Sequence, residues 1–281
     1  MSPIPQLAVV LGSLNRRALL QRTLASVRAN GFSGALEIIV VDGGSADGTC
    51  DWLAKQRDVL TIVQPNYKVP GANGVLRRAH SWGEFINMGF RQARAPWILM
   101  VSDDLLLCPG AIANSLQQMQ ELQRQGRRLG GGALFWRDYP RDRNYHVKLL
   151  PGGFVHINHG FYWKEALEAI GYADETSYEF YGADGDLTMR LNLAGWQTVA
   201  LVSSYAEHLN HPVRWGRLLA LGKERPPIED MEIFETKYRY LTPGPLGFAR
   251  KWSDGRRTAS VFWRTSPWAC AQGILRRWTN R

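Results

Sequence analysis

Strand-like and helix-like segments alternate along the first half of the chain, and this alternation limits the possible folds more than any other feature. Short apolar runs are typical of buried strands, and the segments between them carry apolar residues at helical spacing. Strands that alternate with helices predict an α/β fold with a Rossmann-like, mostly parallel sheet and helices on both faces. The expected strands are 7–13, 35–42, 60–64 and 97–101, and the expected helices are 15–31, 47–56, 81–95 and 109–126.

Local signals support several of these boundaries. Ser81 and Glu84 have the spacing of a capping box at the start of one helix. Gly31 ends the first helix, and Pro109 occupies the first turn of another. Residues 65–80 are mostly polar and contain Pro and Gly, so we expect a long loop there.

Length and composition describe an ordinary globular protein. The 281 residues suffice for one large domain or for a domain with an appendage, and 45% apolar with 21% charged residues is usual. Cys50, Cys108 and Cys270 lack the spacing of a disulfide framework or a zinc site. The N-terminus lacks the pattern of a signal peptide, and no apolar run is long enough to span a membrane. We therefore expect a cytoplasmic protein.

The basic excess lies almost entirely in the last quarter of the chain. Residues 213–281 hold 14 Lys and Arg against 6 Asp and Glu, whereas residues 1–212 hold 20 against 19. This division predicts a main domain at 1–212 and a helical, basic, aromatic-rich extension at 213–281. Arginines and aromatic residues mix at 246–281, which suits an anionic membrane surface, although the aromatics could equally pack on the main domain. The extension carries no known nucleic-acid-binding motif, so no nucleic acid is expected as a partner.

Carboxylates stand at the ends of two expected strands. Asp42 ends one strand, and Asp103 and Asp104 follow another. In open α/β sheets, ligands bind outside the carboxyl ends of the strands. Asp is also a common turn residue, so both interpretations stay open for Asp42. Two adjacent carboxylates repel one another, and Asp103 and Asp104 therefore need a compensating cation.

Four segments follow one another in an order that is characteristic of one enzyme family. The first two are "VVLGSLNRRALLQRTLASV", similar to an opening strand and Asn-Arg turn, and "EIIVVDGGSADGT", similar to a nucleotide-binding segment. The next two are "VSDDLLLCPGAI", similar to a metal-binding segment, and "YEFYGADGDLTMRLNLAGW", similar to a catalytic segment. Together they resemble the family-2 glycosyltransferases of the GT-A fold over about residues 7–211. The resemblance implies a donor-binding half at about 1–110 and an acceptor-binding, catalytic half at about 111–212.

The resemblance implies a divalent ion, Mn²⁺ or Mg²⁺, at Asp103 and Asp104, which we call the acid pair. Asp104 would be a direct ligand, and Asp103 would lie near the ribose of the donor or the water shell of the ion. Both ions prefer oxygen ligands and can neutralise the charge that grows on a diphosphate leaving group. His208 would approach the ion from the far side, although a single histidine is often structural. The family often has Asp at the position that Ser102 occupies here.

The resemblance also assigns residues to the nucleotide of the donor. Asp42 resembles the carboxylate that binds the base, and Ser13 and Asn15 would lie against the nucleotide. Gly43 would let the backbone approach the ligand without a Cβ atom, although a tight turn also explains a glycine. Asn87 could reach the donor, or it could be an ordinary helix residue.

Two carboxylates in the fourth segment are candidates for the catalytic base. Asp184 matches the family's general base and Asp186 the helix residue that follows it, whereas Ala183 stands where the family commonly has Glu. A base is needed because a sugar hydroxyl attacks poorly until its proton is removed. Either Asp could instead be a helix cap, since acids are favoured in the first turn of a helix.

The segment "NHGFYWKEA" resembles the loop and helix start that line the acceptor pocket. The candidate acceptor-binding residues in it are His159, Gly160 and Trp163. An aromatic ring there can stack on a sugar, although packing in a core is the more common role of Trp.

The expected function is the inverting, metal-dependent transfer of a sugar from a nucleotide-diphospho-sugar to a hydroxyl of a saccharide or a lipid-linked saccharide. Two alternatives stay open. One is a non-catalytic nucleotide-sugar-binding protein, which the replacements at Ser102 and Ala183 favour. The other is a sugar-phosphate nucleotidyltransferase, which needs a Gly-rich phosphate loop that "LGSLNRR" does not convincingly supply. Membrane contact through 246–281 would place the protein at the inner face of the membrane.

Overall fold

A mixed eight-stranded sheet forms the centre of the protein, in the order β3-β2-β1-β6-β11-β8-β12-β7. The computed structural model describes residues 4–70, 74, 76–209, 228–241 and 250–253. Neighbouring strands from β3 to β6 are parallel, and so are β8 and β12, whereas β11 and β7 run antiparallel to their neighbours. The strands are β1 Leu7–Ser13, β2 Leu36–Asp42, β3 Val59–Val63, β6 Trp97–Met100, β7 Leu105–Leu107, β8 Leu129–Tyr139, β11 Gly160–Trp163 and β12 Gln197–Leu209. The expected α/β fold with a largely parallel sheet is confirmed.

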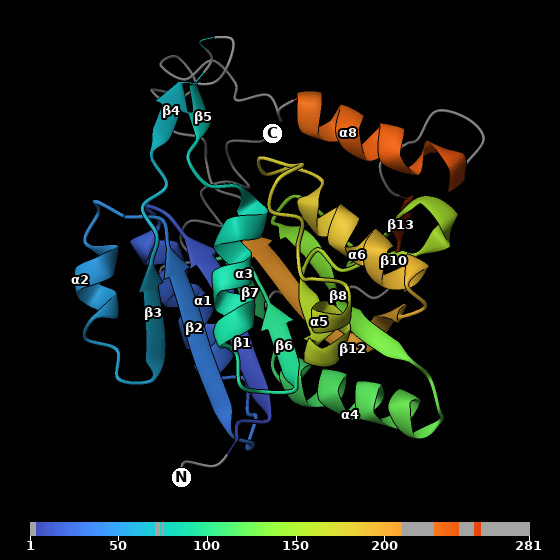
Figure 1. Cartoon of the computed structure of the whole chain (residues 1–281). Coiled ribbons are helices and arrows are strands. Elements are labelled where there is room, and N and C mark those ends of the chain that lie inside the picture. Colours follow the sequence, from blue (N-terminus) through green and yellow to red (C-terminus); the bar gives the residue numbers. More distant parts are fainter. Residues whose placement is uncertain (1–3, 71–73, 75, 210–227, 242–249, 254–281) are drawn as a thin grey trace, which may run out of the picture.

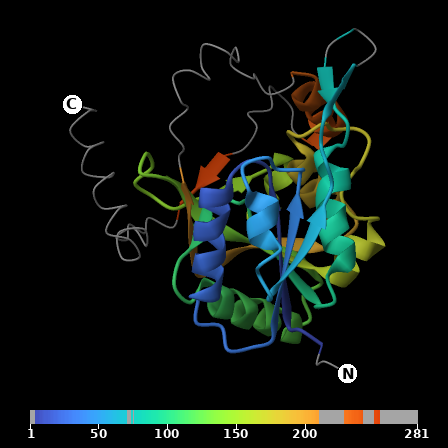
Figure 2. The same cartoon turned by 90° about the vertical axis from the view of Figure 1, so that its left-hand side faces the viewer.

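Helices cover both faces of this sheet (Figure 1). Alternate residues of β1 enter opposite cores, with Leu7, Val9 and Leu11 in one and Ala8 and Val10 in the other. This alternation follows from the period of two in a strand. Turning the molecule by 90° shows α1 and α3 on opposite sides of the strands that they cover (Figure 2). One face carries α1 Arg17–Arg28, α2 Thr49–Leu53 and α4 Ala111–Arg124, and the other carries α3 Trp82–Gln92, α5 Lys164–Ala169 and α6 Ala183–Leu193.

Local sequence signals agree with most of the helix boundaries. The capping box is confirmed, because the Ser81 hydroxyl accepts from the Glu84 N–H while the Glu84 carboxylate accepts from the Ser81 N–H. The helix expected at 47–56 is shorter, and α2 ends at Leu53. Pro109 lies just before α4 rather than in its first turn, because Gly110 is the N-cap.

The long loop expected at 65–80 is in part a hairpin. Lys68–Pro70 (β4) and Leu76–Arg78 (β5) pair antiparallel. The prediction of a loop throughout 65–80 was wrong because these strands are three residues long and mostly exposed, so they lack the apolar pattern of a buried strand. A second small sheet joins β9 Val147–Leu149, β10 Val155–His156 and β13 Arg250–Trp252, with the 3-10 turn η1 at Pro151–Gly153.

The described part of the C-terminal extension packs on the main domain. Helix α8, Ile228–Tyr238, lies over α6 and is followed by the 3-10 turn η2 at Arg239–Leu241 (Figure 1). Phe234 and Tyr238 of α8 share a buried cluster with Tyr178 and Met189. Residues 213–227 of the extension, and the basic aromatic segment at 246–281 apart from 250–253, lie outside the described residues.

None of the helices in the described ranges is long and apolar enough to cross a membrane.

Candidate active site

The acid pair sits in the turn between β6 and β7, beside the end of β1. Ser13, the last residue of β1, donates from its hydroxyl to Asp103 Oδ2 at 2.8 Å. Arg16 Nη1 donates to Asp103 Oδ1 at 3.1 Å and to Asp104 Oδ2 at 2.9 Å. Only 5% of each carboxylate side chain is exposed, whereas 44% of the Arg16 side chain is. Burial raises the pKa of Asp103 in spite of Arg16, and the charge of Asp104 adds to the rise.

The compensating cation in the structure is therefore Arg16. Arg16 was not predicted as a site residue from the sequence, although it belongs to the Asn-Arg turn that the family resemblance rests on. Its contact with Asp104 spans 88 positions of the chain, and only the parallel pairing of β1 with β6 makes it possible. The sequence did contain a signal for this contact. Arg16 is a cation just after the carboxyl end of the expected strand 7–13, and ligands bind at the carboxyl ends of such strands.

His208 lies on the opposite side of Asp104. Its Nε2 is 3.3 Å from Asp104 Oδ1, and its Nδ1 is 2.8 Å from Asp138 Oδ1. The Ser102 hydroxyl also donates to Asp104 Oδ1. Burial lowers the pKa of His208, but the carboxylates of Asp104 and Asp138 outweigh burial and raise it above its usual value. The structure thus brings together the two side chains that the sequence predicted as metal ligands.

These residues fit a divalent ion only in part. Among the described residues, no group of three or more His, Cys, Asp and Glu side chains forms a site that could hold a metal. Asp104 and His208 supply one oxygen and one nitrogen donor that face each other. A Mg²⁺-type site commonly uses one or two carboxylates and takes its remaining ligands from substrate phosphates and water. The donor set therefore suits an ion that binds together with a diphosphate.

Asp42 is fully buried at the end of β2 and caps the turn that follows. Its Oδ1 accepts from the N–H groups of Gly44 and Ser45 at 2.9 and 2.7 Å, and its Oδ2 accepts from the Ser45 hydroxyl at 2.7 Å. Asn15 joins the same turn, because its Oδ1 accepts from the Ala46 N–H at 2.7 Å. These bonds agree with the turn interpretation of Asp42. Gly43 lies between Asp42, at the carboxyl end of β2, and the turn that these bonds fix.

Asn87 and Trp163 are not brought to this edge. The Asn87 amide is fully buried, and its nitrogen donates to the Ala173 carbonyl at 2.9 Å. Trp163 pairs with Trp97 at the amino end of β6, and their rings lie 4.7 Å apart. Gly160 begins the same strand β11 but pairs with Met100, at the end of β6 from which the acid pair follows. The segment expected as a loop from Gly160 to Trp163 is thus a strand of the sheet.

Asp184 opens α6 and is held by two neighbours. His156 Nε2 lies 3.1 Å from Asp184 Oδ2, and Asn158 donates to the same oxygen at 2.7 Å. Burial would raise the pKa of Asp184, but His156 and Asn158 outweigh it and hold the pKa of this carboxyl well below its usual range. Asp184 is therefore ionised at neutral pH, with 20% of its side chain exposed. Neither His156 nor Asn158 was predicted from the sequence, although Asn158 is the first residue of the segment selected for acceptor binding and His156 lies two residues before it.

His159 lies close enough to both Asp104 and Asp184 to feel their charges. Its ring stacks on His208 with centroids 5.7 Å apart, and both Asp104 and Asp184 act on it electrostatically. Burial, aided by the charge of His208, lowers the pKa of His159 to about 3. The ring is therefore neutral at pH 7 and adds no positive charge between the acid pair and Asp184.

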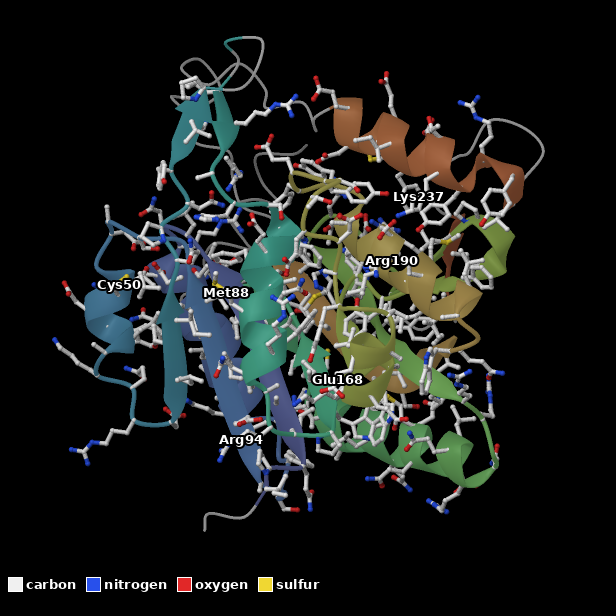
Figure 3. The ribbon with its side chains drawn as sticks, in the orientation of Figure 1. Cys50, Met88, Arg94, Glu168, Arg190 and Lys237 are labelled. Atoms are coloured by element: carbon white, nitrogen blue, oxygen red, sulfur yellow. The ribbon has the colours of Figure 1, made fainter. Side chains whose placement is uncertain are left out.

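Asp186 is fully buried between α6 and α8. Tyr178 and Tyr238 donate to its Oδ1 at 3.2 and 2.7 Å, and Lys237 donates to the same oxygen at 2.6 Å. Arg190 Nε donates to its Oδ2 at 2.8 Å. Figure 3 shows Lys237 between the two helices and Arg190 on α6. Asp186 thus joins the extension to α6 and is not exposed toward a ligand.

The comparisons with known proteins identify the family. The family model of glycosyl transferase family 2 matches residues 8–171, and the chain belongs to this family. A GalNAc(5)-diNAcBac-PP-undecaprenol beta-1,3-glucosyltransferase of Campylobacter jejuni subsp. jejuni serotype O:2 is 31% identical over 122 residues. That match covers 42% of this chain and 36% of the relative, so the chain matches about a third of the relative's length.

Solved structures of sugar transferases share the fold. A mannosyltransferase from Pyrobaculum calidifontis, in complex with GDP-Man and Mn²⁺, has a TM-score of 0.56 at 18% identity, over 85% of this chain and 70% of that one. Staphylococcus aureus TarS in complex with UDP-GlcNAc has a TM-score of 0.55 at 15% identity, over 74% of this chain and 60% of that one. At these identities the likeness concerns the fold alone, and the expected GT-A fold is confirmed.

Proposed function

We propose that the protein is an inverting glycosyltransferase that moves a sugar from a nucleotide-diphospho-sugar to a hydroxyl of a saccharide or lipid-linked saccharide. The observation that carries this proposal is the pairing of two sites at one edge of the sheet. One is the acid pair with Arg16 and His208, and the other is the ionised Asp184. His159 is coupled electrostatically to Asp104 and Asp184 and so connects the two sites.

Asp184 is the general base of this proposal. Its ionised carboxylate would accept the proton of the acceptor hydroxyl as the oxygen attacks the anomeric carbon and the bond from that carbon to the diphosphate breaks. One base acting opposite the leaving group gives a single displacement and inversion at that carbon. Asp186 is unsuited to the role because it is fully buried and bonded to four donors.

Asp104 and His208 are the residues that would hold a Mn²⁺ or Mg²⁺ ion. Such an ion supplies positive charge that neutralises the diphosphate leaving group. The mannosyltransferase of similar fold contains Mn²⁺ together with GDP-Man, which supports the same pairing here. Asp103 is held by Ser13 and Arg16 next to this site, in a position to meet the ribose or the water shell of the ion.

The donor nucleotide would lie across the turns after β1 and β2. Asn15 and Asp42 use their side-chain oxygens to fix these turns, so we infer that they shape the nucleotide site rather than recognise the base through those atoms. Gly43 lies between them, where its lack of a side chain leaves the backbone open to the nucleotide. For Asn87 the structure offers no contact with this edge.

The acceptor would approach from the side of His159 and Gly160, which border Asp184 and the acid pair. A related enzyme is named for transfer to an undecaprenol-linked saccharide, which supports a lipid-linked acceptor here. Contact of 246–281 with an anionic membrane surface would bring the enzyme to such a substrate. In this proposal 1–212 is the catalytic domain, and 213–281 contributes α8 as a support for α6.

Turnover of nucleotide sugars by the full chain tests the proposal. We expect release of a nucleoside diphosphate in the native protein, a loss of about 10²–10⁴-fold in Asp184→Asn, and native rates in Asp51→Asn, an exposed acid on α2. A nucleotidyltransferase would instead form a nucleotide sugar from a sugar phosphate and a nucleoside triphosphate, and release inorganic pyrophosphate. Nucleotide-sugar binding without turnover would favour the non-catalytic alternative.

A further inference from the structure

Arg16 contacts one oxygen of Asp104, the carboxylate that the proposed metal ion would need, and leaves the other oxygen facing His208. Its Nη1 bridges Asp103 Oδ1 and Asp104 Oδ2 at 3.1 and 2.9 Å. The two acids are nearly buried, so their charges are weakly screened and their interaction with a cation is strong. The Arg16 side chain is nearly half-exposed, so it also reaches solvent at the edge where the donor would bind.

A divalent ion that binds Asp104 would add positive charge beside Arg16, which already offsets one of the two negative charges of the carboxylate pair. Like charges a few ångströms apart repel, so Arg16 opposes the ion as long as nothing else negative is present. A diphosphate changes this balance, because its oxygens attract both the ion and a guanidinium, and arginine matches phosphate with several parallel donors. The geometry thus favours the ion and the diphosphate together over the ion alone.

We propose that Arg16 couples metal binding to nucleotide binding: it blocks the ion in the free protein and turns to the diphosphate when the donor arrives. This inference rests on the proposed function, since it needs a diphosphate-bearing donor at this edge. It assigns to Arg16 both an inhibitory role toward the free ion and a binding role toward phosphate. Coupling between two ligands is reciprocal, so the nucleotide must raise the affinity for the ion by the factor by which the ion raises the affinity for the nucleotide.

The test is the affinity for Mn²⁺, measured on the full chain by electron paramagnetic resonance of free Mn²⁺ or by calorimetry, with and without UDP or GDP. In the native protein we expect weak binding of Mn²⁺ alone and much tighter binding with the nucleoside diphosphate. In Arg16→Gln we expect Mn²⁺ alone to bind about tenfold more tightly, while the gain from the nucleotide falls by at least tenfold. Arg17→Gln, which removes the neighbouring cation on α1, should bind as the native protein does.

A purely structural role for Arg16 gives a different result. Loss of a structural ion pair would lower the melting temperature and weaken or leave unchanged the binding of Mn²⁺. Tighter binding of Mn²⁺ in Arg16→Gln therefore supports the inference, and unchanged or weaker binding overturns it. Arg16→Lys retains one positive charge without the planar fork, so it should keep Mn²⁺ binding weak and still lose affinity for the diphosphate. If the native protein binds neither UDP nor GDP under any condition, the proposed function itself fails.

Discussion

At the scale of single residues, the environment of Asp184 decides what this carboxylate can do. His156 and Asn158 contact one of its oxygens and keep it ionised, while a fifth of the side chain stays open to solvent. A base with a low pKa gains less from accepting a proton than one that is tuned near neutrality. Its advantage is that it is ready to accept a proton over the whole physiological range, so the acidic limb of a pH–rate profile would not come from Asp184.

The pH dependence of stability checks this environment. An Asp with a lowered pKa in the folded state stabilises the protein above its unfolded value of about 3.9, and the contribution disappears as the pH falls through the folded value. We therefore expect the native protein to exceed Asp184→Asn by about 2 kcal/mol in unfolding free energy at pH 7, and by less below pH 4. Urea unfolding at pH 7, 5 and 3.5 measures this difference, and a gap that stays constant or grows toward acid contradicts the assignment.

Sequence could indicate some of these residues but not their partners. Asp103, Asp104 and Asp184 were predictable because each follows a strand or opens a helix in a recognisable segment. Arg16 and His156 act through contacts that join distant parts of the chain, and no local pattern marks such a contact. Asp186 shows the same limit, because its burial depends on Tyr238, which lies 52 positions away.

At the scale of elements, α8 supports the start of α6. The Asp230 carboxylate, on α8, accepts from three successive N–H groups at 179–181 at 2.8–2.9 Å, in the segment that leads to Asp184. Phe234 packs over Gly185, where an added Cβ would lie 3.0 Å from its ring. Ala183 is fully buried in the same cluster, so a Glu at this position would have to displace the packing of α8. Ala183, which stands where the family commonly has Glu, thus leaves room for α8 to pack over this position.

Asp230 is the residue through which this support can be tested. Replacement of Asp230 by Ala leaves three backbone donors without their carboxylate, and we expect a loss of about 2–3 kcal/mol in unfolding free energy. Glu229→Ala is the matched control, because the neighbouring side chain is 66% exposed and its ion pair with Arg77 is worth at most about 1 kcal/mol. Chemical denaturation gives both values, and hydrogen exchange at 179–181 should rise only in the Asp230 variant. Equal losses in the two variants would mean that α8 does not hold this segment.

At the scale of the whole molecule, the sheet places residues from distant segments close together, at the carboxyl ends of β1, β2 and β6. The alternation of strands and helices predicted the parallel strands β1, β2, β3 and β6 and the presence of helices on both faces of the sheet. The antiparallel strands β7 and β11 were not predicted, because they are short and their place in the sheet depends on long-range pairing. These two strands nevertheless complete the site, since Gly160 begins β11 and the acid pair precedes β7.

We propose above all that the edge formed by Asp103 and Asp104 binds a nucleoside diphosphate together with a divalent ion. The most direct measurement is the melting temperature of the full chain with UDP or GDP, with and without Mn²⁺. A ligand that binds only the folded state at 100 times its Kd adds about 2.7 kcal/mol, so we expect a rise of several degrees that requires Mn²⁺. The rise should nearly vanish in Asp104→Ala and persist in Asp51→Ala. A rise of the same size in Asp104→Ala, or one that does not depend on Mn²⁺, would contradict the account.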